Sequence, residues 1–364
     1  MHTLWGRYAL TAIAAATLLA ACGGGDSSDT DGGNTSPVSS IVVMGDSLSD
    51  SGTFGTKFTV QGNDADGKPF KVWPEYVAAA YDNTPCPYYR ATSATTFVTA
   101  DSCLNYAVGG AQINPLGADG QRNTNTPLSV LRQIEDASAK GIASNALLLV
   151  DGGANDAAAL VRATGAALST SPPNTTALMG LLSSRISPAQ LNAYFADGMT
   201  AGVAAAGAQY MEVLAQDLAS SLKANVLDKG NARIALMNVP PITQTPQFSA
   251  APDSLKGLAN NWVSVFNTAL EKELGYNSRV AIIDFHDQLQ QQIASPSSYG
   301  YSNVTASVCA STMAPTCTAT TLSGNPTTAG WASHMFADPF HPTPYGHQQI
   351  SKFVMQSIEG KGWK

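Results

Sequence analysis

Five short apolar segments, separated by longer stretches with helical periodicity, limit this chain to a narrow range of folds. Segments of this kind predict buried strands, and their alternation with helices is typical of a parallel sheet covered by helices on both faces. We therefore expect an α/β fold with a five-stranded parallel sheet. The strand candidates are residues 41–44, 104–108, 146–150, 233–238 and 279–285.

The helical patterns fall between these segments and after the last one. Low-complexity loops interrupt the alternation, and we interpret them as surface insertions in a single domain that covers residues 41–364, because no internal repeat or boundary is visible. Pro344 suits the first turn of the last helix. The predicted helices are residues 73–81, 128–139, 188–225, 254–274 and 343–359, and the predicted loops are residues 83–100, 114–127, 169–176 and 294–330.

The N-terminus has the pattern of a targeting segment. Arg7 precedes an uncharged, Ala/Leu-rich stretch that is shorter than the roughly 20 residues needed to span a bilayer, so residues 1–21 are predicted to be a signal peptide. The sequence "LAAC", which ends at Cys22, resembles a bacterial lipobox, and we expect Cys22 to be lipidated. Residues 22–40 would then form a flexible linker with a span of roughly 25 Å. The expected location is the bacterial outer membrane or cell surface; the alternative is an ordinary signal peptide and a secreted protein.

The charge pattern argues against polyanionic partners. Only 12% of the residues are charged, the net charge is −7, and no basic run is present. Nucleic acid is therefore not expected as a partner, and an anionic membrane surface would offer little electrostatic attraction. Contact with a membrane is expected only through the lipid anchor.

The cysteine count fits an exported protein. Five cysteines are present, and setting Cys22 aside leaves an even number, which suggests two disulfides in an oxidising compartment. Three pairings are possible. We favour Cys86–Cys103 and Cys309–Cys317 because each pair closes a short loop; free buried thiols are the alternative.

Three polar, glycine-containing segments follow predicted strands: residues 45–47, 109–111 and 151–156. The carboxyl ends of parallel strands meet at one edge of a sheet, and ligands bind outside that edge. We therefore expect these three segments to lie together and to form a binding site.

Ser47 could serve that site in two ways. It follows the first strand where a helix should begin, so it could be a helix cap, or it could be a nucleophile if a base lies nearby. His341 is the best candidate base, because the prolines around it stiffen a turn in which Asp338 could orient its ring. In the alternative interpretation, Asp338 only caps the main-chain N–H groups of that turn.

An oxyanion would need hydrogen-bond donors that are already in place. The main-chain N–H groups of Ser47 and Gly110 and the side chain of Asn155 are the candidates, although a glycine turn and an Asx-turn explain the last two equally well. We expect Asp46 and Asp156 to order their loops rather than to act as acids.

Two further histidines bear on the site. We expect His347 to lie on a helix surface. A role for His286 or His347 in lining the site stays open.

Four sequence blocks then carry a family resemblance. "GDSLSDSG", "NYAVGGA", "GGANDA" and "DPFHPT" occur in this order and resemble the blocks of the GDSL (SGNH) hydrolase family, in its lipolytic branch. The resemblance implies a flavodoxin-like three-layer α/β/α sandwich. It also implies a catalytic triad of Ser47, Asp338 and His341, with the oxyanion hole formed by Ser47, Gly110 and Asn155.

The resemblance and the residues together predict a serine carboxylic ester hydrolase: a lipolytic esterase, with phospholipase activity a possibility. It would act on lipid or short-acyl esters through an acyl-enzyme, without a metal or organic cofactor. An acyltransferase with the same site, a carbohydrate O-deacetylase and a non-catalytic surface binding protein are the alternatives.

Overall fold

The computed structural model describes residues 37–170, 172–309, 314–318, 320–322 and 330–364. The predicted signal peptide, the lipidation site at Cys22 and most of the predicted linker lie outside these residues. Within the described part, the main-chain N–H of Ser39 donates to the carbonyl of Asn145 at 3.3 Å, so the chain is already held to the domain just before the first strand.

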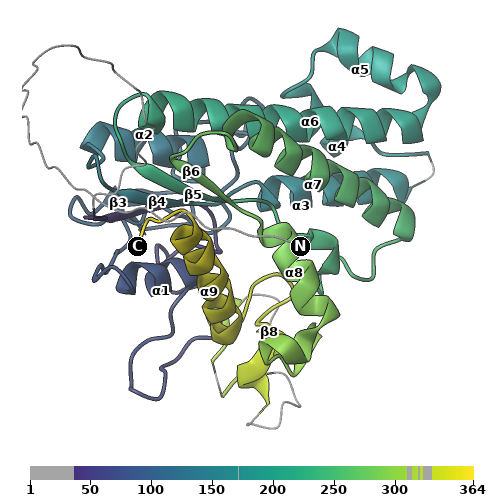
Figure 1. The fold of residues 1–364 in the computed structure, drawn as a ribbon. Coiled ribbons are helices and arrows are strands. Elements are labelled where there is room, and N and C mark those ends of the chain that lie inside the picture. The colour runs from purple at the N-terminus through teal and green to yellow at the C-terminus, as the bar shows by residue number, and fades with distance from the viewer. Residues whose placement is uncertain (1–36, 171, 310–313, 319, 323–329) are drawn as a thin grey trace, which may run out of the picture. The chain divides into compact units, whose positions relative to one another are not determined.

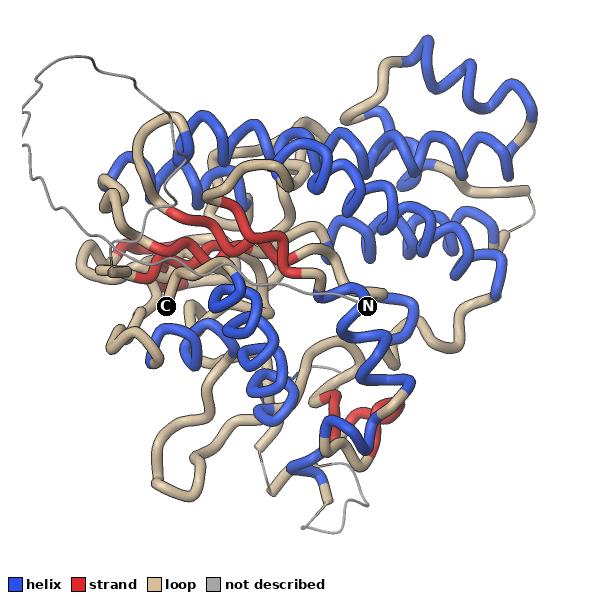
Figure 2. Tube along the Cα trace, in the orientation of Figure 1, coloured by secondary structure: helices blue, strands red, loops and turns tan. Residues whose placement is uncertain are grey.

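A four-stranded parallel sheet forms the centre of the domain (Figures 1 and 2). Its strands pair in the order β1-β4-β5-β6, and each lies within an apolar segment that the sequence predicts to be a strand. Strand β1 in particular has four consecutive buried residues, as expected of a strand covered on both faces. The strands are β1 (Ile41–Met44), β4 (Leu147–Val150), β5 (Arg233–Met237) and β6 (Val280–Ile283).

The prediction of a fifth strand over residues 104–108 is wrong. This segment runs parallel to β1, and Tyr106 donates to the carbonyl of Val43 at 2.7 Å, but only isolated bridges form. The pairing stops at Gly45. Val108 still donates to the carbonyl of Gly45 at 3.2 Å, but the N–H of Gly45, which the next rung needs, donates to Oε1 of Gln133 at 2.8 Å instead.

Helices cover both faces of the sheet (Figure 1). Alternate strand residues point to opposite faces: Val42 and Met44 join one hydrophobic core, while Ile41 and Val43 join another. The first core is covered by α2 (Val130–Lys140), α3 (Ala154–Leu168), α6 (Met199–Leu222) and α7 (Asp253–Leu274), and the second by α1 (Trp73–Ala79), α8 (Phe285–Ala294) and α9 (Pro344–Gly360).

The long helix predicted over residues 188–225 is broken in the structure. It divides into α5 (Pro188–Tyr194) and α6, because Gly198 between them adopts a φ of +98° that ends one helix before the next begins. Helices α3, α4 (Thr176–Ser183) and α8 were not among the predicted helices. Two small sheets complete the fold: β2 (Tyr89–Ala91) with β3 (Phe97–Thr99), and β7 (Asn303–Ser307) with β8 (His334–Phe336).

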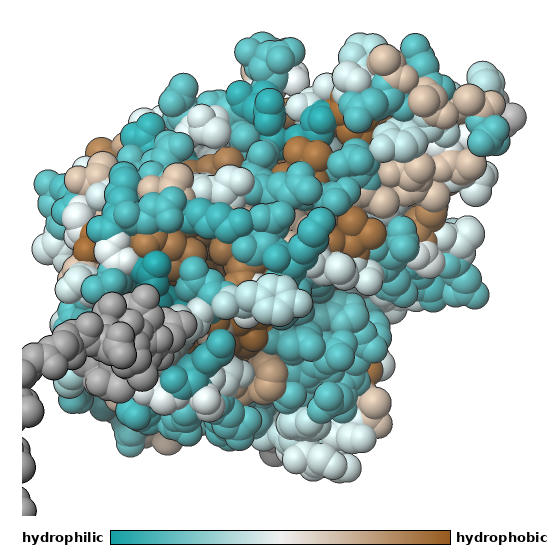
Figure 3. Space-filling model, turned by 45° about the horizontal axis from the view of Figure 1, so that its top comes forward, coloured by the Kyte–Doolittle hydropathy of each residue, from teal (hydrophilic) through white to brown (hydrophobic). Residues whose placement is uncertain are grey.

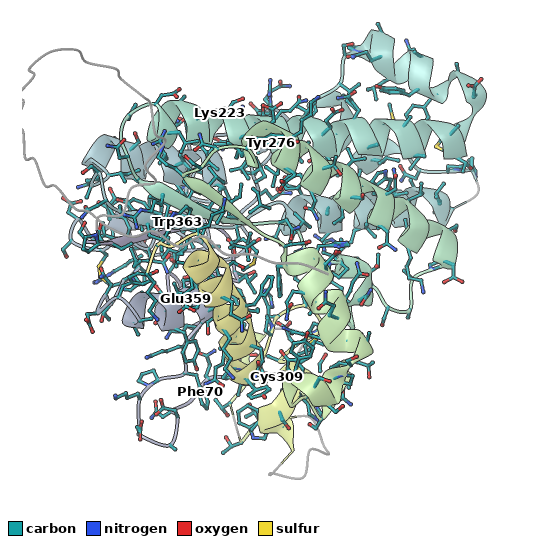
Figure 4. All side chains as sticks on the ribbon, viewed as in Figure 1. Phe70, Lys223, Tyr276, Cys309, Glu359 and Trp363 are labelled. Atoms are coloured by element: carbon teal, nitrogen blue, oxygen red, sulfur yellow. A yellow bond between two sulfur atoms is a disulfide. The ribbon has the colours of Figure 1, made fainter. Side chains whose placement is uncertain are left out.

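The structure confirms the favoured disulfide pairing, Cys86 with Cys103 and Cys309 with Cys317. Figure 4 shows Cys309 near the N-terminal end of α9, whereas Glu359 and Trp363 lie at its C-terminal end. There the main-chain N–H of Cys309 donates to the carbonyl of Ala337 at 2.8 Å. The second disulfide therefore supports the loop that contains Asp338.

The surface follows the composition. On the face drawn in Figure 3, hydrophilic residues predominate and hydrophobic residues show as separate patches between them. Within the described ranges, no helix combines the length and the apolar character needed to cross a bilayer.

Candidate active site

Ser47 lies in a tight turn directly after β1. No helix begins there, which corrects the expectation from the sequence: Ser49 and Asp50 both donate to the carbonyl of Asp46, at 3.1 and 3.0 Å. Gly45 makes the sharp exit from the strand possible, because its φ is +154° and a Cβ there would lie 1.5 Å from an oxygen of Asp151. The strand end thus presents Ser47 at the sheet edge.

A continuous chain of hydrogen bonds joins Ser47, His341 and Asp338. Nε2 of His341 lies 2.8 Å from Oγ of Ser47, and Nδ1 lies 2.7 Å from Oδ2 of Asp338. The other carboxylate oxygen of Asp338 accepts from the main-chain N–H groups of Phe340 and His341 at 2.8 and 2.7 Å. The same carboxylate therefore caps the N–H groups of the turn and also contacts the ring, so Asp338 does more than cap the turn.

The charge state of Asp338 suits this arrangement. Burial raises the pKa of its carboxyl, but the hydrogen bond and the charge of His341, together with the two N–H donors, outweigh burial and leave the pKa below its ordinary value. An ionised Asp338 accepts a proton that Nδ1 holds, and this leaves Nε2 facing the hydroxyl of Ser47.

Gly110, rather than Gly109, has a main-chain N–H that is available to a ligand. The N–H of Gly109 donates to Asp50 at 2.8 Å, and the aromatic ring of Phe58 covers it. In the described part of the chain, neither the N–H of Gly110 nor that of Ser47 has a hydrogen-bond partner. Gly110 has a φ of +80°, and the space beside its Cα is open. These two N–H groups are therefore free donors beside Oγ of Ser47.

Asn155 reaches the same place, but its amide is already engaged. Nδ2 donates to the carbonyl of Ala111 at 2.9 Å and to Oδ2 of Asp46 at 3.3 Å. The second bond is long, and contacts of this kind in unliganded sites often change when substrate binds. An oxyanion beside Ser47 could take over the hydrogen that Asp46 now accepts.

Three buried carboxyls lie under the Ser47 turn. Asp151 accepts from the N–H of Asp46 at 3.1 Å and from the hydroxyl of Ser49 at 2.7 Å. Burial raises the pKa of Asp46 and raises that of Asp151 still further, because the charge of Asp46 adds to the effect; burial also raises the pKa of Asp50. The three carboxyls hold the turn by hydrogen bonds, and Asp151 reaches it from a segment about 100 positions away in the sequence.

Asp156 holds the neighbouring loop. Its Oδ2 accepts from the N–H of Ile113 at 3.0 Å. Burial raises its pKa to about 6, against the lowering effects of that hydrogen bond and of the nearby charge of Arg185. Arg185 in turn donates to the carbonyl of Asn114 at 2.7 Å and to Asp217 at 2.9 Å. This network fixes the segment just after Gly110.

The two other histidines of interest lie elsewhere. His347 is fully buried on α9, which corrects the prediction of a helix surface position; its Nδ1 accepts from the N–H of Trp73 at 3.3 Å. Burial and then the charge of His341 lower the pKa of His347 to about 3. His286 lies on α8 with its Nδ1 3.0 Å from Asp287.

Asp284, His286 and Asp287 form the one cluster of metal-ligand type found among the described residues, with ligand atoms within 4.8 Å of one another. The two carboxylates are exposed, and Asp284 already caps α8 and binds Asn238. None of the three lines the cavities at Ser47.

Ser47 and His341 line two hollows, which we name the outer hollow and the inner cavity. The outer hollow, about 180 Å³, is also lined by Gly110 and Asn155. The inner cavity is walled mainly by apolar side chains of β5, α8, β8 and α9. The inner cavity has a volume of about 60 Å³, compared with about 10–15 Å³ for a cavity that holds one ordered water. It therefore suits a slender chain.

Sequence reasoning missed several side chains that build this site. Gln133 donates to the carbonyl of Gly45 at 3.0 Å and accepts from its N–H at 2.8 Å, and it is fully buried. Its position on the apolar stripe of a predicted helix, three residues after Val130, is a signal that could have found it. The segment of Asp151 was predicted to lie at the site, but the bonds of its carboxylate to the Ser47 turn were not.

The family model described as GDSL-like Lipase/Acylhydrolase matches residues 41–354. A protein from Pseudomonas putida, described as an uncharacterized protein in the trpE-trpG intergenic region, is 28% identical over 344 residues. The match covers 90% of this chain and 50% of that protein, so the chain spans about half the length of this relative.

Solved structures with a similar course of the chain include two from Streptomyces. The phospholipase A1 of Streptomyces albidoflavus NA297 is 14% identical with a TM-score of 0.41, and the extracellular lipase of Streptomyces rimosus is 12% identical with a TM-score of 0.42. Each match covers 87% of this chain and 98% of the other. The lipase/acylhydrolase of Enterococcus faecalis is 11% identical, with a TM-score of 0.38 over 88% of this chain and 95% of that one.

Proposed function

The chain belongs to the GDSL-like lipase/acylhydrolase family, and from this membership and the geometry at Ser47 we propose that it is a serine esterase. It cleaves carboxylic esters through an acyl-enzyme intermediate. The observation that carries this proposal is the hydrogen-bonded line from Asp338 through His341 to Ser47, with distances of 2.7 and 2.8 Å.

The reaction proceeds in two steps. His341 takes the proton of Ser47 at Nε2 as Oγ attacks the ester carbonyl carbon, and the C–O bond to the leaving alcohol then breaks while His341 returns the proton to it. In the second step, water gives a proton to His341 and attacks the acyl carbon. The bond between this carbon and Oγ then breaks, His341 returns the proton to Oγ, and the acid leaves. Asp338 stays ionised and stabilises the imidazolium that forms in both steps.

The negative charge on the former carbonyl oxygen needs donors beside Ser47. The free N–H groups of Ser47 and Gly110 support this role, and Asn155 completes the set by exchanging its long contact with Asp46 for the oxyanion. The apolar inner cavity supports an acyl chain as the part of the substrate that is bound there.

A fluorophosphonate probe and p-nitrophenyl esters of graded chain length test this proposal. The probe should label the wild-type protein and fail to label Ser47→Ala, and the same variant should lose ester hydrolysis. Ser51→Ala is the matched control, because it makes the same change four residues later in the same segment and should keep both signals. If the folded wild-type protein shows neither labelling nor hydrolysis, the proposal that it is a serine esterase is wrong.

We also propose that Cys22 is lipidated and anchors the enzyme to a bacterial membrane. The support is the lipobox-like sequence and the polar, glycine-rich segment that follows it. Expression of the full chain with Cys22→Ser should move the enzyme from the membrane to the soluble fraction. A wild-type protein that is already soluble would reject the anchor without affecting the proposed chemistry.

A further inference from the structure

The inner cavity contains one polar group that the proposed reaction does not use. Gln292 lines this cavity together with Met237, Val239 and Phe285, and its side chain is almost fully buried. Its Oε1 accepts from the hydroxyl of Tyr301 at 3.1 Å, whereas its Nε2 has no hydrogen-bond partner. A buried amide donor without a partner costs free energy, so it calls for an explanation in function.

The helix explains why this amide faces the cavity. Phe285, Leu289 and Gln292 are spaced four and three residues apart on α8, so they lie on one face of the helix, and all three line the cavity. An apolar residue would suit this position on packing grounds alone. The position is instead held by a glutamine whose oxygen is fixed by Tyr301, which leaves the amide nitrogen as the free end.

The other polar side chains of this wall are all satisfied. Asn238 donates to Asp284 at 2.8 Å and accepts from the N–H of His286 at 2.8 Å. The hydroxyl of Thr245 donates to the carbonyl of Ile242 at 2.6 Å. Asp151 is held by Asp46 and Ser49, as described above. Among the side chains lining the cavity, Gln292 therefore carries the one nitrogen that has no hydrogen-bond partner.

We propose that the preferred acyl group carries an oxygen acceptor on its chain, and that Nε2 of Gln292 donates a hydrogen bond to it. The inference rests on the proposed esterase function and deepens it by naming the acyl class: a hydroxy-, oxo- or ether-bearing chain rather than a plain alkyl chain. An oxygen of the acyl chain next to Nε2 of Gln292 accepts its hydrogen bond, whereas a methylene at the same place leaves the N–H without a partner. The enzyme therefore discriminates because the plain alkyl chain binds with an unpaired buried donor.

A scan of ether oxygens along the acyl chain tests the proposal. The probes are p-nitrophenyl esters of one chain length, in which each methylene in turn is replaced by oxygen. An ether oxygen accepts a hydrogen bond and cannot donate one, so it reports on a donor in the wall. We expect one position of the oxygen to raise kcat/KM by about tenfold over the all-carbon chain, with the other positions at or below it.

Gln292→Leu should remove that preference. Leucine is close in size and has no donor, so within this variant the best ether ester and the all-carbon ester should have the same kcat/KM, without the tenfold gain. Gln291→Leu makes the same change at the adjacent, exposed position and should retain the wild-type profile. If the hydroxyl of Tyr301, left alone, prevents folding, the double variant Gln292→Leu/Tyr301→Phe replaces both partners and gives the same test.

The outcomes separate the two proposals. A wild-type enzyme that hydrolyses the all-carbon esters but favours no oxygen position overturns the acyl-class inference and leaves the esterase intact. The same holds if a favoured position persists in Gln292→Leu. A folded protein that neither hydrolyses any of these esters nor reacts with the fluorophosphonate overturns both.

Discussion

His341 and Ser47 lie in hydrogen-bond contact, with 2.8 Å between Nε2 and Oγ, although 294 positions separate them in the sequence. The two residues approach from opposite ends of the domain sequence: Ser47 follows the first strand of the sheet, and His341 precedes α9. The small β7–β8 sheet and the Cys309–Cys317 disulfide support the histidine loop, because the N–H groups of Val308 and Cys309 donate to the carbonyl of Ala337. The site therefore depends on the docking of one C-terminal segment.

Asp338→Asn should lower kcat by about 10⁴ with little loss of stability. The asparagine oxygen can still accept from the N–H groups of Phe340 and His341, but its NH₂ group facing Nδ1 favours the imidazole tautomer with the proton on Nε2. That tautomer cannot take the proton of Ser47. Steady-state kinetics measure the effect, and thermal unfolding checks the fold. A folded variant with near wild-type kcat would show that the carboxylate does not orient the base.

Asn155→Ala should lower kcat by about 10²–10³ and change KM little, because the amide would stabilise charge that develops only in the transition state. The loss of its bond to Ala111 is the competing explanation. Ala158→Ser, a change on the same helix at the edge of the outer hollow, gives a control for general disturbance. A rise in KM at constant kcat would mean that Asn155 only positions the loop.

The sequence predicted the strands that place the site better than the contacts that build it. The apolar segment before Ser47 and the one before Asp151 are strands because unbroken runs of Val, Leu and Ile suit a sheet that is covered on both faces. Residues 104–108 are also mainly apolar, yet their pairing with β1 stops at Gly45, whose N–H donates to Gln133 instead. Composition alone does not reveal such a long-range partner.

The same limit applies to burial. His347 looks like a surface residue on an amphipathic helix, and only the docking of α1 against α9 encloses it. The bond between Gln133 and Gly45 likewise joins segments 88 positions apart. The family blocks marked the residues at the centre of the site, whereas the side chains that hold those residues are dispersed over the chain and carry no local motif.

Replacing both cysteines of the Cys309–Cys317 disulfide by serine should lower the free energy of unfolding by about 2–3 kcal/mol, since the bond closes a short loop. The change should also lower kcat, because both cysteines pack against Ala337, next to Asp338. The corresponding change at Cys86 and Cys103 should lower stability by a similar amount. Urea unfolding and kinetics on both variants decide the point; equal kcat in the two would argue against support of the histidine loop.

Asp156→Asn should become more stable relative to the wild type as pH rises. Burial raises the pKa of Asp156 from 3.8 to about 6 in the folded protein, so the stability that the protonated form contributes is present below pH 4 and lost as pH rises through 6. The difference corresponds to about 3 kcal/mol. Asparagine is neutral throughout and can still accept from Ile113. Urea unfolding of both proteins at pH 4 and pH 7 measures the trend, and a difference that does not change with pH would contradict it.

His347→Gln should show the opposite trend in the same pH range. Burial lowers the pKa of His347 from 6.5 to about 3 in the folded protein. Below pH 6.5 the unfolded chain therefore binds a proton that the folded protein does not bind. As the pH falls from 6.5 toward 3, the free energy of unfolding decreases by up to about 5 kcal/mol. Glutamine can accept from the N–H of Trp73 and does not titrate. The variant should therefore gain stability relative to the wild type as pH drops from 7 to 4. Because Asp156 and His347 act in opposite directions over this range, the wild-type profile partly cancels, and only the paired variants, measured by urea unfolding at each pH, separate the two groups.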